Sequence, residues 1–240
     1  MTIGTLDSFA LILLFVLTVF FPLLGIWDFR RLLRWIQEGR ADARIKSYRW
    51  ILVMEWGLTL ALLGWWLAAG RDVLSLGLLP AAAGWQWLTI GAGLAGVVFL
   101  TWQMVAVMRS PAKLKELREN MGELAGMAPT TDAEHGHFRM VAITAGICEE
   151  IIYRGLLLTV LTAAVGLWPA VALSSVIFGL GHAYQGWSGI ARTFLVGVVM
   201  ALLTVFSGSL FVAIILHIAA DLTSGRMMSA ALRAEPEMVA

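Results

Sequence analysis

Residues 147–155 read ICEEIIYRG, a stretch in which three charged side chains interrupt an otherwise apolar run. A charged side chain near the middle of a lipid bilayer is costly unless it is paired. Glu150 and Arg154 are four residues apart with the acid first, so on a helix they share a face in the orientation that favours an ion pair. Glu149 lies about 100° away around the helix and has no such partner. The stretch therefore predicts a buried ion pair that organises a site, beside one carboxylate that is free for chemistry.

The composition around this stretch is that of an integral membrane protein. Apolar residues make up 60% of the 240 residues and charged residues 14%, and the mean hydropathy is +0.83. Apolar runs of the roughly 20 residues that a helix needs to cross a bilayer recur along the chain, whereas a membrane β-barrel would show short alternating strands. The predicted fold is an all-α integral membrane protein, with residues 1–240 forming a single polytopic domain.

Seven apolar segments predict a bundle of about seven transmembrane helices. They cover approximately residues 9–27, 50–69, 85–108, 138–166, 169–184, 190–206 and 210–222. Because the last three segments are short, an eighth segment, re-entrant or interfacial, is an alternative. The first run lacks a preceding basic segment and a following cleavage site, so we expect a retained span rather than a signal peptide. No repeat of the kind found in inverted-repeat transporters is visible in the sequence.

Basic residues concentrate in two segments, 28–49 and 109–137, which the positive-inside rule assigns to the cytoplasm as loops. We expect the first of them to include an amphipathic helix at the membrane surface. Seven crossings then place the N-terminus outside and the C-terminus in the cytoplasm, in a membrane that we expect to be a bacterial inner membrane. The formal net charge of +1 gives no sign of nucleic-acid binding, and the lipid bilayer is the expected surroundings.

Few other polar side chains fall at membrane depth. Glu55 lies in the second span, His182 at the end of the fifth, and His217 with Asp221 in the seventh. In the predicted topology the two histidines and Asp221 share the cytoplasmic half of the bilayer with Glu149. Such a set can activate a water molecule and stabilise an oxyanion, or bind a metal through two histidines and one carboxylate. Glu55 has no evident partner, and we interpret it as a polar contact between helices or a snorkelling side chain, with a role in substrate access as the alternative.

These residues form three motifs that resemble those of the CPBP family of intramembrane proteases, which includes the CAAX prenyl endopeptidases and the bacteriocin-processing or Abi proteins. The motifs are EExxxR at 149–154, FxxxH at 178–182 and HxxxN/D at 217–221. They occur in the order found in the family, each on an apolar span, within a core of about residues 138–222. The first half of the chain shows only general membrane character.

The resemblance implies that Glu149 is the general base that activates water, with His182 beside it. His217 and Asp221 would stabilise the tetrahedral oxyanion. Asp221 stands where the CAAX endopeptidases have asparagine, and an ionised carboxylate cannot donate a hydrogen bond to an oxyanion. Asp221 is therefore either protonated or orients His217 as a cationic donor.

Glu150 and Arg154 are implied by the resemblance to hold the motif helix and to tune the site. Members of the family have been described both as metal-dependent and as glutamate-dependent proteases. The cofactor is therefore left open between none and one divalent metal such as zinc, which Glu149, His182 and His217 would bind. A purely structural role for the buried acids and Arg154, as an ion-pair network that fixes helix packing, is the alternative to a catalytic one.

The leading functional hypothesis is an intramembrane endopeptidase that cleaves a membrane-tethered or lipid-modified peptide or protein on the cytoplasmic side. The alternative from another class is a non-enzymatic membrane protein, a proton-coupled carrier or an immunity-type factor, that uses the same acids and histidines as a relay. A third hypothesis is a metal-storage or metal-transport protein with His182 and His217 as ligands. A thiol protease based on Cys148 is disfavoured, because an apolar environment suppresses the thiolate.

Overall fold

The computed structural model describes residues 7–78 and 86–234, and within these ranges it contains helices and turns but no β-strand. The prediction of an all-α fold is therefore confirmed. The α-helices are α1 (Ser8–Phe15), α2 (Phe21–Gln37), α3 (Ala43–Ala68), α4 (Gln86–Met108), α5 (Pro111–Met121), α6 (Asp132–Glu149), α7 (Leu158–Val165), α8 (Leu167–Gly181), α9 (Gly186–Ser207) and α10 (Phe211–Arg233).

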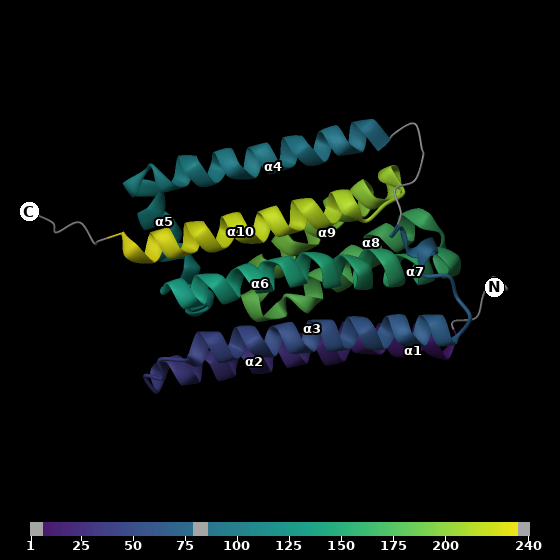
Figure 1. Ribbon diagram of the computed structural model, residues 1–240, viewed down its shortest axis with the longest axis horizontal. Helices are drawn as coiled ribbons and strands as arrows, with labels where there is room; N and C mark the ends of the chain where they lie inside the picture. Colours follow the sequence, from purple (N-terminus) through teal and green to yellow (C-terminus); the bar gives the residue numbers. More distant parts are fainter. Residues whose placement is uncertain (1–6, 79–85, 235–240) are drawn as a thin grey trace, which may run out of the picture.

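Short helical segments of other types join some of these helices. Two are π-helical, η1 (Val16–Phe20) between α1 and α2 and η4 (Glu150–Leu157) between α6 and α7, so residues 8–37 and 132–165 each form one long helical rod. The others are short 3-10 turns, η2 (Leu74–Leu76), η3 (Gly122–Met127) and η5 (Ala183–Gln185). Across the described residues, these two rods and the helices α3, α4, α8, α9 and α10 make seven helical passes, which lie side by side (Figure 1).

Five of these helical passes are long and apolar enough to cross a membrane, namely Ser8–Gln37, Ala43–Ala68, Gln86–Met108, Ala183–Ser207 and Phe211–Arg233. Helix α8 is apolar but shorter. The rod of residues 132–165 carries Glu149, Glu150 and Arg154 near its middle. A helical membrane protein is thus confirmed, whereas the count of seven spans, or eight, stays a prediction.

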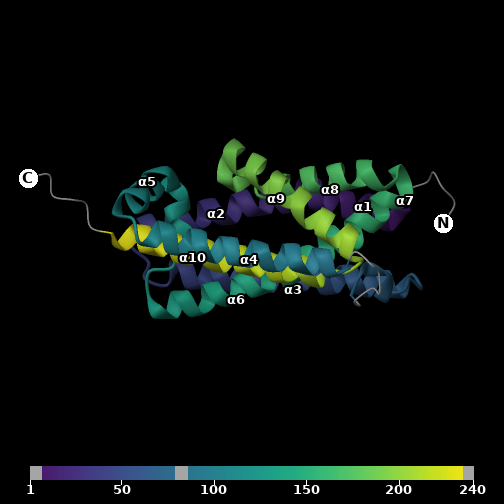
Figure 2. The ribbon, with the colours of Figure 1, turned by 90° about the horizontal axis from the view of Figure 1, so that it is seen from above.

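The helical passes alternate in direction along the long axis of the bundle (Figure 1). Helix α10 packs against α4, α6 and α9, and α6 packs in turn against α3. Viewed from above, α3 and α6 lie on one side of α10, and α8 and α9 lie on the other (Figure 2). The two sides meet through the rod of residues 132–165, because α7 packs against α8. Each motif therefore lies on a helix, or at the end of one, that packs against neighbouring helices.

The two basic segments are largely helical rather than loops. Helix α2 continues to Gln37 and α3 begins at Ala43, so only a short turn remains between them within 28–49. In 109–137, α5 and η3 precede the first turns of α6. Both segments lie at the same end of the bundle, where α10 also ends (Figure 1). Their shared position is what the predicted topology requires, and their location in the cytoplasm remains a prediction.

The start of the motif rod is fixed by a capping box, which the sequence motif Thr131 to Glu134 encodes. The Thr131 hydroxyl accepts from the backbone N–H of Glu134 at 3.2 Å, and Glu134 Oε2 accepts from the backbone N–H of Thr131 at 3.1 Å. Arg44 of α3 lies 3.7 Å from the same carboxyl group. The cap therefore also ties the rod to α3 at the basic end of the bundle.

Candidate active site

The site is built on the point where the motif rod changes from α-helix to π-helix. Helix α6 ends at Glu149 and the π-helical η4 begins at Glu150, and every residue of η4 is buried. Arg154 Nη1 lies 3.0 Å from Glu150 Oε1, the ion pair that the four-residue spacing predicts. Short π-helical segments inside α-helices are frequent at functional sites.

Arg154 is held from two further sides. Its Nη2 atom donates to the carbonyl oxygen of Gly197 on α9 at 3.3 Å. Its Cζ atom lies 4.0 Å from the centre of the Phe178 ring on α8, a cation–π contact. The guanidinium thus connects the rod to α8 and α9. Arg154 is only 3% exposed, so these contacts are buried.

Glu150 makes a second contact that the sequence did not predict. His217 Nδ1 on α10 donates to Glu150 Oε1 at 2.8 Å, so this one oxygen accepts from both Arg154 and His217. The bond fixes the orientation of the imidazole ring and turns its Nε2 atom towards Glu149 and Asp221. There, Nε2 lies 3.9 Å from Glu149 Oε2 and 3.8 Å from Asp221 Oδ2.

Asp221 therefore does not hold the Nδ1 atom of His217, since Glu150 occupies that position. The Asp221 side chain is 37% exposed and lies beside Nε2 at a distance too long for a direct hydrogen bond. In this geometry the His217 ring is oriented by Glu150, and the Asp221 carboxyl group lies beside Nε2 without bonding to it.

His182 is placed by the residue that opens its own motif. Its Nδ1 atom donates to the carbonyl oxygen of Phe178 at 3.0 Å, and the two rings pack with centroids 4.9 Å apart. This uses the four-residue spacing of FxxxH, because a side chain just beyond the end of α8 can reach the carbonyl one turn back. The remaining nitrogen, Nε2, lies 4.0 Å from Glu149 Oε2.

Glu149 Oε2 is consequently the point on which both histidines converge. It is buried and accepts no hydrogen bond, while the Nε2 atoms of His182 and His217 lie 4.0 and 3.9 Å away. These distances are too long for direct hydrogen bonds, but a water molecule between such groups can bond to each of them. Chemically, the arrangement can hold a water molecule between one carboxylate and two imidazoles.

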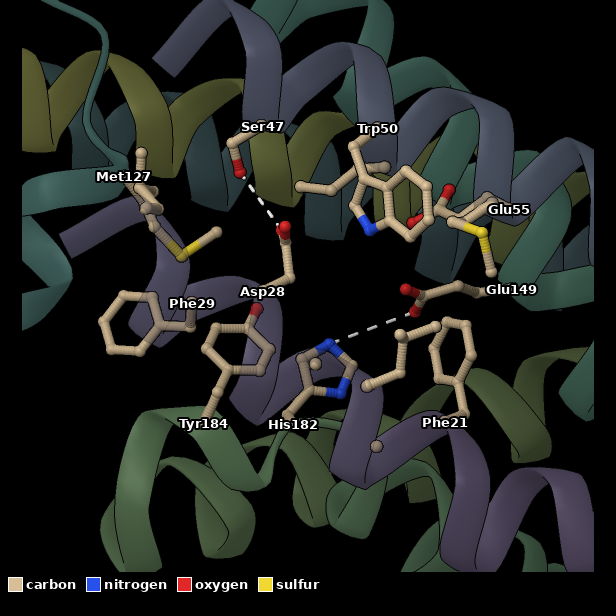
Figure 3. A pocket seen from close by; sticks show the side chains of 16 residues that line it. Phe21, Asp28, Phe29, Ser47, Trp50, Glu55, Met127, Glu149, His182 and Tyr184 are labelled. Carbon is tan, nitrogen blue, oxygen red and sulfur yellow. Dashed lines mark hydrogen bonds and ion pairs between the residues drawn. The ribbon is translucent and has the colours of Figure 1, made fainter. Parts of the chain in front are cut away.

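A cavity of about 110 Å³ opens beside Glu149 and His182 (Figure 3). This space is large enough for several water molecules. Helices α2 and α3 supply most of its wall, including Phe21 and Trp50, and Tyr184 supplies part from the turn after α8. Met127 of η3 also lines the cavity, which places that part of it toward the basic end of the bundle. Glu149 and His182 therefore lie directly at the cavity.

Three glycines allow the helices to approach closely enough to bring these groups together. A Cβ atom on Gly146 of α6 would lie 3.1 Å from the backbone nitrogen of Ile218 on α10, the neighbour of His217. At the end of α8, a Cβ on Gly179 would lie 2.9 Å from the Ile190 carbonyl oxygen, and one on Gly181 would lie 2.8 Å from Tyr153 Oη. Small residues at these crossings are typical of helix contacts in membranes.

The side chains as placed do not form a metal site. Two imidazoles and a carboxylate are ligands that zinc accepts, but zinc bonds of about 2.0–2.1 Å put tetrahedral ligand atoms about 3.4 Å apart. Here the imidazole nitrogens lie 3.9 and 4.0 Å from Glu149 Oε2. Among the residues that the structure describes, no group of three or more His, Cys, Asp or Glu side chains is arranged to hold a metal ion.

Glu55 of α3 is the pocket residue whose position the sequence did not predict. It lines the cavity together with Glu149 and His182, and its carboxyl group faces the same space (Figure 3). The signal in the sequence was its depth, because an ionisable residue inside a membrane span is by default a candidate for function. Nothing in the sequence indicated that α3 would face α6 at this level.

Comparison with known proteins assigns the part of the chain that holds the motifs. Residues 135–223 match a family described as type II CAAX prenyl endopeptidase Rce1-like, a family of proteases. No curated protein and no solved structure matches the chain. The matched segment contains all six predicted site residues and leaves out α1–α5, including Glu55. The resemblance to the CPBP proteases is thereby confirmed for this segment: residues 135–223 match the family of Rce1-like type II CAAX prenyl endopeptidases.

Proposed function

We propose that the protein is an intramembrane endopeptidase that hydrolyses a peptide bond with a water molecule activated by Glu149. One observation carries the proposal. Glu149 Oε2 is buried, has no hydrogen-bond partner and lies within 4.0 Å of the Nε2 atoms of two histidines, beside a cavity with room for water. A carboxylate in this setting can take a proton from water, and the histidines can orient the water and the substrate carbonyl group.

The first step is attack by water. Glu149 accepts one proton, the water oxygen forms a bond to the carbonyl carbon, and the carbonyl oxygen becomes an oxyanion. His182 fits the role of a group that orients this water, because its Nδ1–H is committed to the Phe178 carbonyl and its Nε2 faces Glu149. General base catalysis of this kind contributes typically about 10²–10⁴-fold in rate.

The oxyanion requires a donor, and His217 is the residue best placed to be one. Its ring is surrounded by carboxyl groups of Glu150, Glu149 and Asp221 at 2.8, 3.9 and 3.8 Å. Three nearby carboxyl groups favour an imidazolium, which donates from Nε2 as well as from Nδ1. In this role Asp221 needs no proton of its own, because it supports the charge of His217.

Collapse of the tetrahedral intermediate completes the reaction. The carbon–nitrogen bond breaks, the leaving amine takes the proton from Glu149, and the carboxylic acid product releases its remaining proton to water and becomes a carboxylate. Glu150 and Arg154 do not touch the reacting atoms in this scheme. They are positioning residues: Arg154 compensates the charge of Glu150, and Glu150 holds the His217 ring.

The substrate in this proposal is a membrane-tethered or lipid-modified peptide or protein. Its support is the location of the cavity, which is surrounded by helices and extends towards the end of the bundle that carries the basic segments. With those segments in the cytoplasm, cleavage takes place on the cytoplasmic side of a bacterial inner membrane, with the N-terminus of the chain outside.

The test is a comparison of peptide termini in membranes of cells that express the wild type or Glu149→Ala. Mass spectrometry should find termini that appear with the wild type and are absent with the variant at equal protein levels. The Glu116→Gln variant, which changes an exposed acid on α5, serves as the matched control and should give the wild-type termini. Identical termini with the wild type and a folded Glu149→Ala protein would contradict the proposal, and substrate-driven proton movement in vesicles would point to a carrier instead.

A further inference from the structure

Glu55 is a buried acid for which the proposed reaction has no use. It is 6% exposed, its Oε2 atom has no hydrogen-bond partner, and no ion pair in the described part of the chain includes it. It lies on α3, outside the segment that matches the protease family. Nevertheless its carboxyl group faces the cavity that contains Glu149 and His182 (Figure 3).

The other carboxyl groups of this cavity have compensating neighbours. Asp28 forms an ion pair with Arg31 and accepts a hydrogen bond from Ser47 at 3.1 Å. Glu149 faces two imidazoles. An acid left without such a neighbour in apolar surroundings is strongly destabilising when ionised, and a cation placed against it removes that cost. Glu55 is therefore the carboxyl group in the cavity at which a bound cation would lower the free energy most.

The walls of the cavity indicate what kind of cation fits. They are mainly apolar and aromatic: Phe21 and Leu24 of α2 and Trp50, Ile51 and Met54 of α3 all contribute. A small hydrated metal ion gains nothing from such walls. A side chain with a hydrocarbon stem and a charged tip buries the stem against them and keeps the tip for a carboxylate, as lysine and arginine side chains do.

We propose that Glu55 determines specificity for a basic side chain, lysine or arginine, close to the scissile bond of the substrate. This inference rests on the proposed function, because the same cavity contains the carboxylate that activates water. The cationic tip of the substrate side chain contacts Glu55 while the nearby peptide bond reaches Glu149. The first half of the chain thus supplies recognition, and the segment 135–223 supplies the chemistry.

The first test measures binding and does not depend on cleavage. The probes are phenylbutylammonium and phenylbutanol, which share an apolar stem and differ in charge. Purified wild-type protein in detergent should bind the amine about tenfold more tightly than the alcohol, a difference of a size that one buried charge contact readily supplies. Glu55→Gln, which keeps the shape of the side chain, should bind both probes equally. Glu116→Gln should retain the preference of the wild type.

The second test measures selectivity in cleavage. Lipid-anchored peptide libraries that vary lysine, methionine and glutamate at each position are digested, and the products are identified by mass spectrometry. The wild type should enrich lysine at a single position near the cleaved bond by about tenfold over methionine. Glu55→Gln should cleave the lysine and methionine peptides at similar rates, and Glu55→Asp should restore part of the preference for lysine.

Three results would overturn the inference. The wild type could bind amine and alcohol equally, or the amine preference could disappear in Glu149→Gln and persist in Glu55→Gln, which would make Glu149 the cation site. Alternatively, Glu55→Gln could slow the cleavage of all peptides alike, which would make Glu55 part of the chemistry. Failure of the proposed function is a separate result, because it appears as the absence of Glu149-dependent cleavage, whereas the binding test reports on Glu55 in either case.

Discussion

The segment 135–223 and the helices α2 and α3 each contain one largely buried acid–arginine pair and one further acid that lines the cavity. In the segment 135–223 the pair is Glu150 with Arg154 and the other acid is Glu149. In α2 and α3 the pair is Asp28 with Arg31 and the other acid is Glu55. The halves differ in what surrounds the second acid, because only Glu149 has histidines beside it. The difference teaches that burial alone does not make an acid catalytic; its neighbours decide its role.

The two pairs also differ in depth and in what they position. Arg154 and Glu150 have 2% and 0% of their side chains exposed, against 14% and 10% for Arg31 and Asp28. Glu150 uses one oxygen, Oε1, to accept from both Arg154 and His217. Arg31 instead lies over the rings of Trp27, Trp35 and Trp50, near the end of α2. The deeper pair orients a site residue, and the shallower pair anchors a helix end.

The largest effect on stability is expected from breaking the deeper pair. Arg154→Met leaves Glu150 buried without a cation and should lower the free energy of unfolding by about 3–5 kcal/mol, as seen when one partner of a buried pair is removed. Thermal unfolding in detergent measures the change. The double variant Glu150→Gln with Arg154→Met should regain part of the stability but not the activity, because a neutral amide at position 150 no longer supports a positive charge on the His217 ring.

The matched variant in the other half is Arg31→Met, and it should cost only about 1–2 kcal/mol, since its pair is closer to the surface and its ring contacts are worth about 0.5–1 kcal/mol each when exposed. Activity should survive in this variant once the protein is folded. An equal loss of stability in Arg31→Met and Arg154→Met would contradict the distinction between the two pairs.

Whether the sequence predicts a contact depends on how far apart in the chain its two residues lie. The pair of Glu150 with Arg154 and the bond between His182 and Phe178 follow from four-residue spacings. The bond between Glu150 and His217 joins residues that are 67 positions apart and depends on the close approach of α6 and α10 at Gly146. No local pattern encodes that approach.

The position of Glu55 and the helices in the basic segments could not be predicted from the sequence, each for a different physical reason. Glu55 showed only its depth, since facing the cavity depends on how α3 is rotated against α6. The segments 28–49 and 109–137 are predicted as loops because they are rich in charged residues. In the structure, helices extend beyond the apolar runs into both segments. The fold class and the motif segment were predictable, because both rest on composition and local spacing.

The smallest effect is expected where the two halves are tied together at the basic end. Burial raises the pKa of Glu134, but hydrogen bonds from Thr130 and Thr131 and the charge of Arg44 outweigh it, so the pKa lies below its ordinary value. A lowered pKa adds stability above the unfolded-state pKa of the carboxyl group, and this stability is lost as the pH falls through the folded-state pKa.

Glu134→Gln should therefore lower the free energy of unfolding by about 1 kcal/mol at neutral pH, the usual size of a lost cap. The difference from the wild type should shrink as the solution is acidified below the ordinary range of a glutamate. Unfolding curves of both proteins across this pH range provide the measurement. A difference that stays constant with pH would mean that the carboxylate charge of Glu134 does not contribute.

The most direct test of the central claim is the turnover number of purified Glu149→Gln on a peptide whose cleavage by the wild type has been established. The variant keeps the shape of the side chain but cannot accept a proton from water. Its kcat should fall by about 10²–10⁴-fold with KM and thermal stability close to those of the wild type, the size of effect expected for loss of a general base. A folded Glu149→Gln protein that cleaves the peptide at the wild-type kcat would contradict the account.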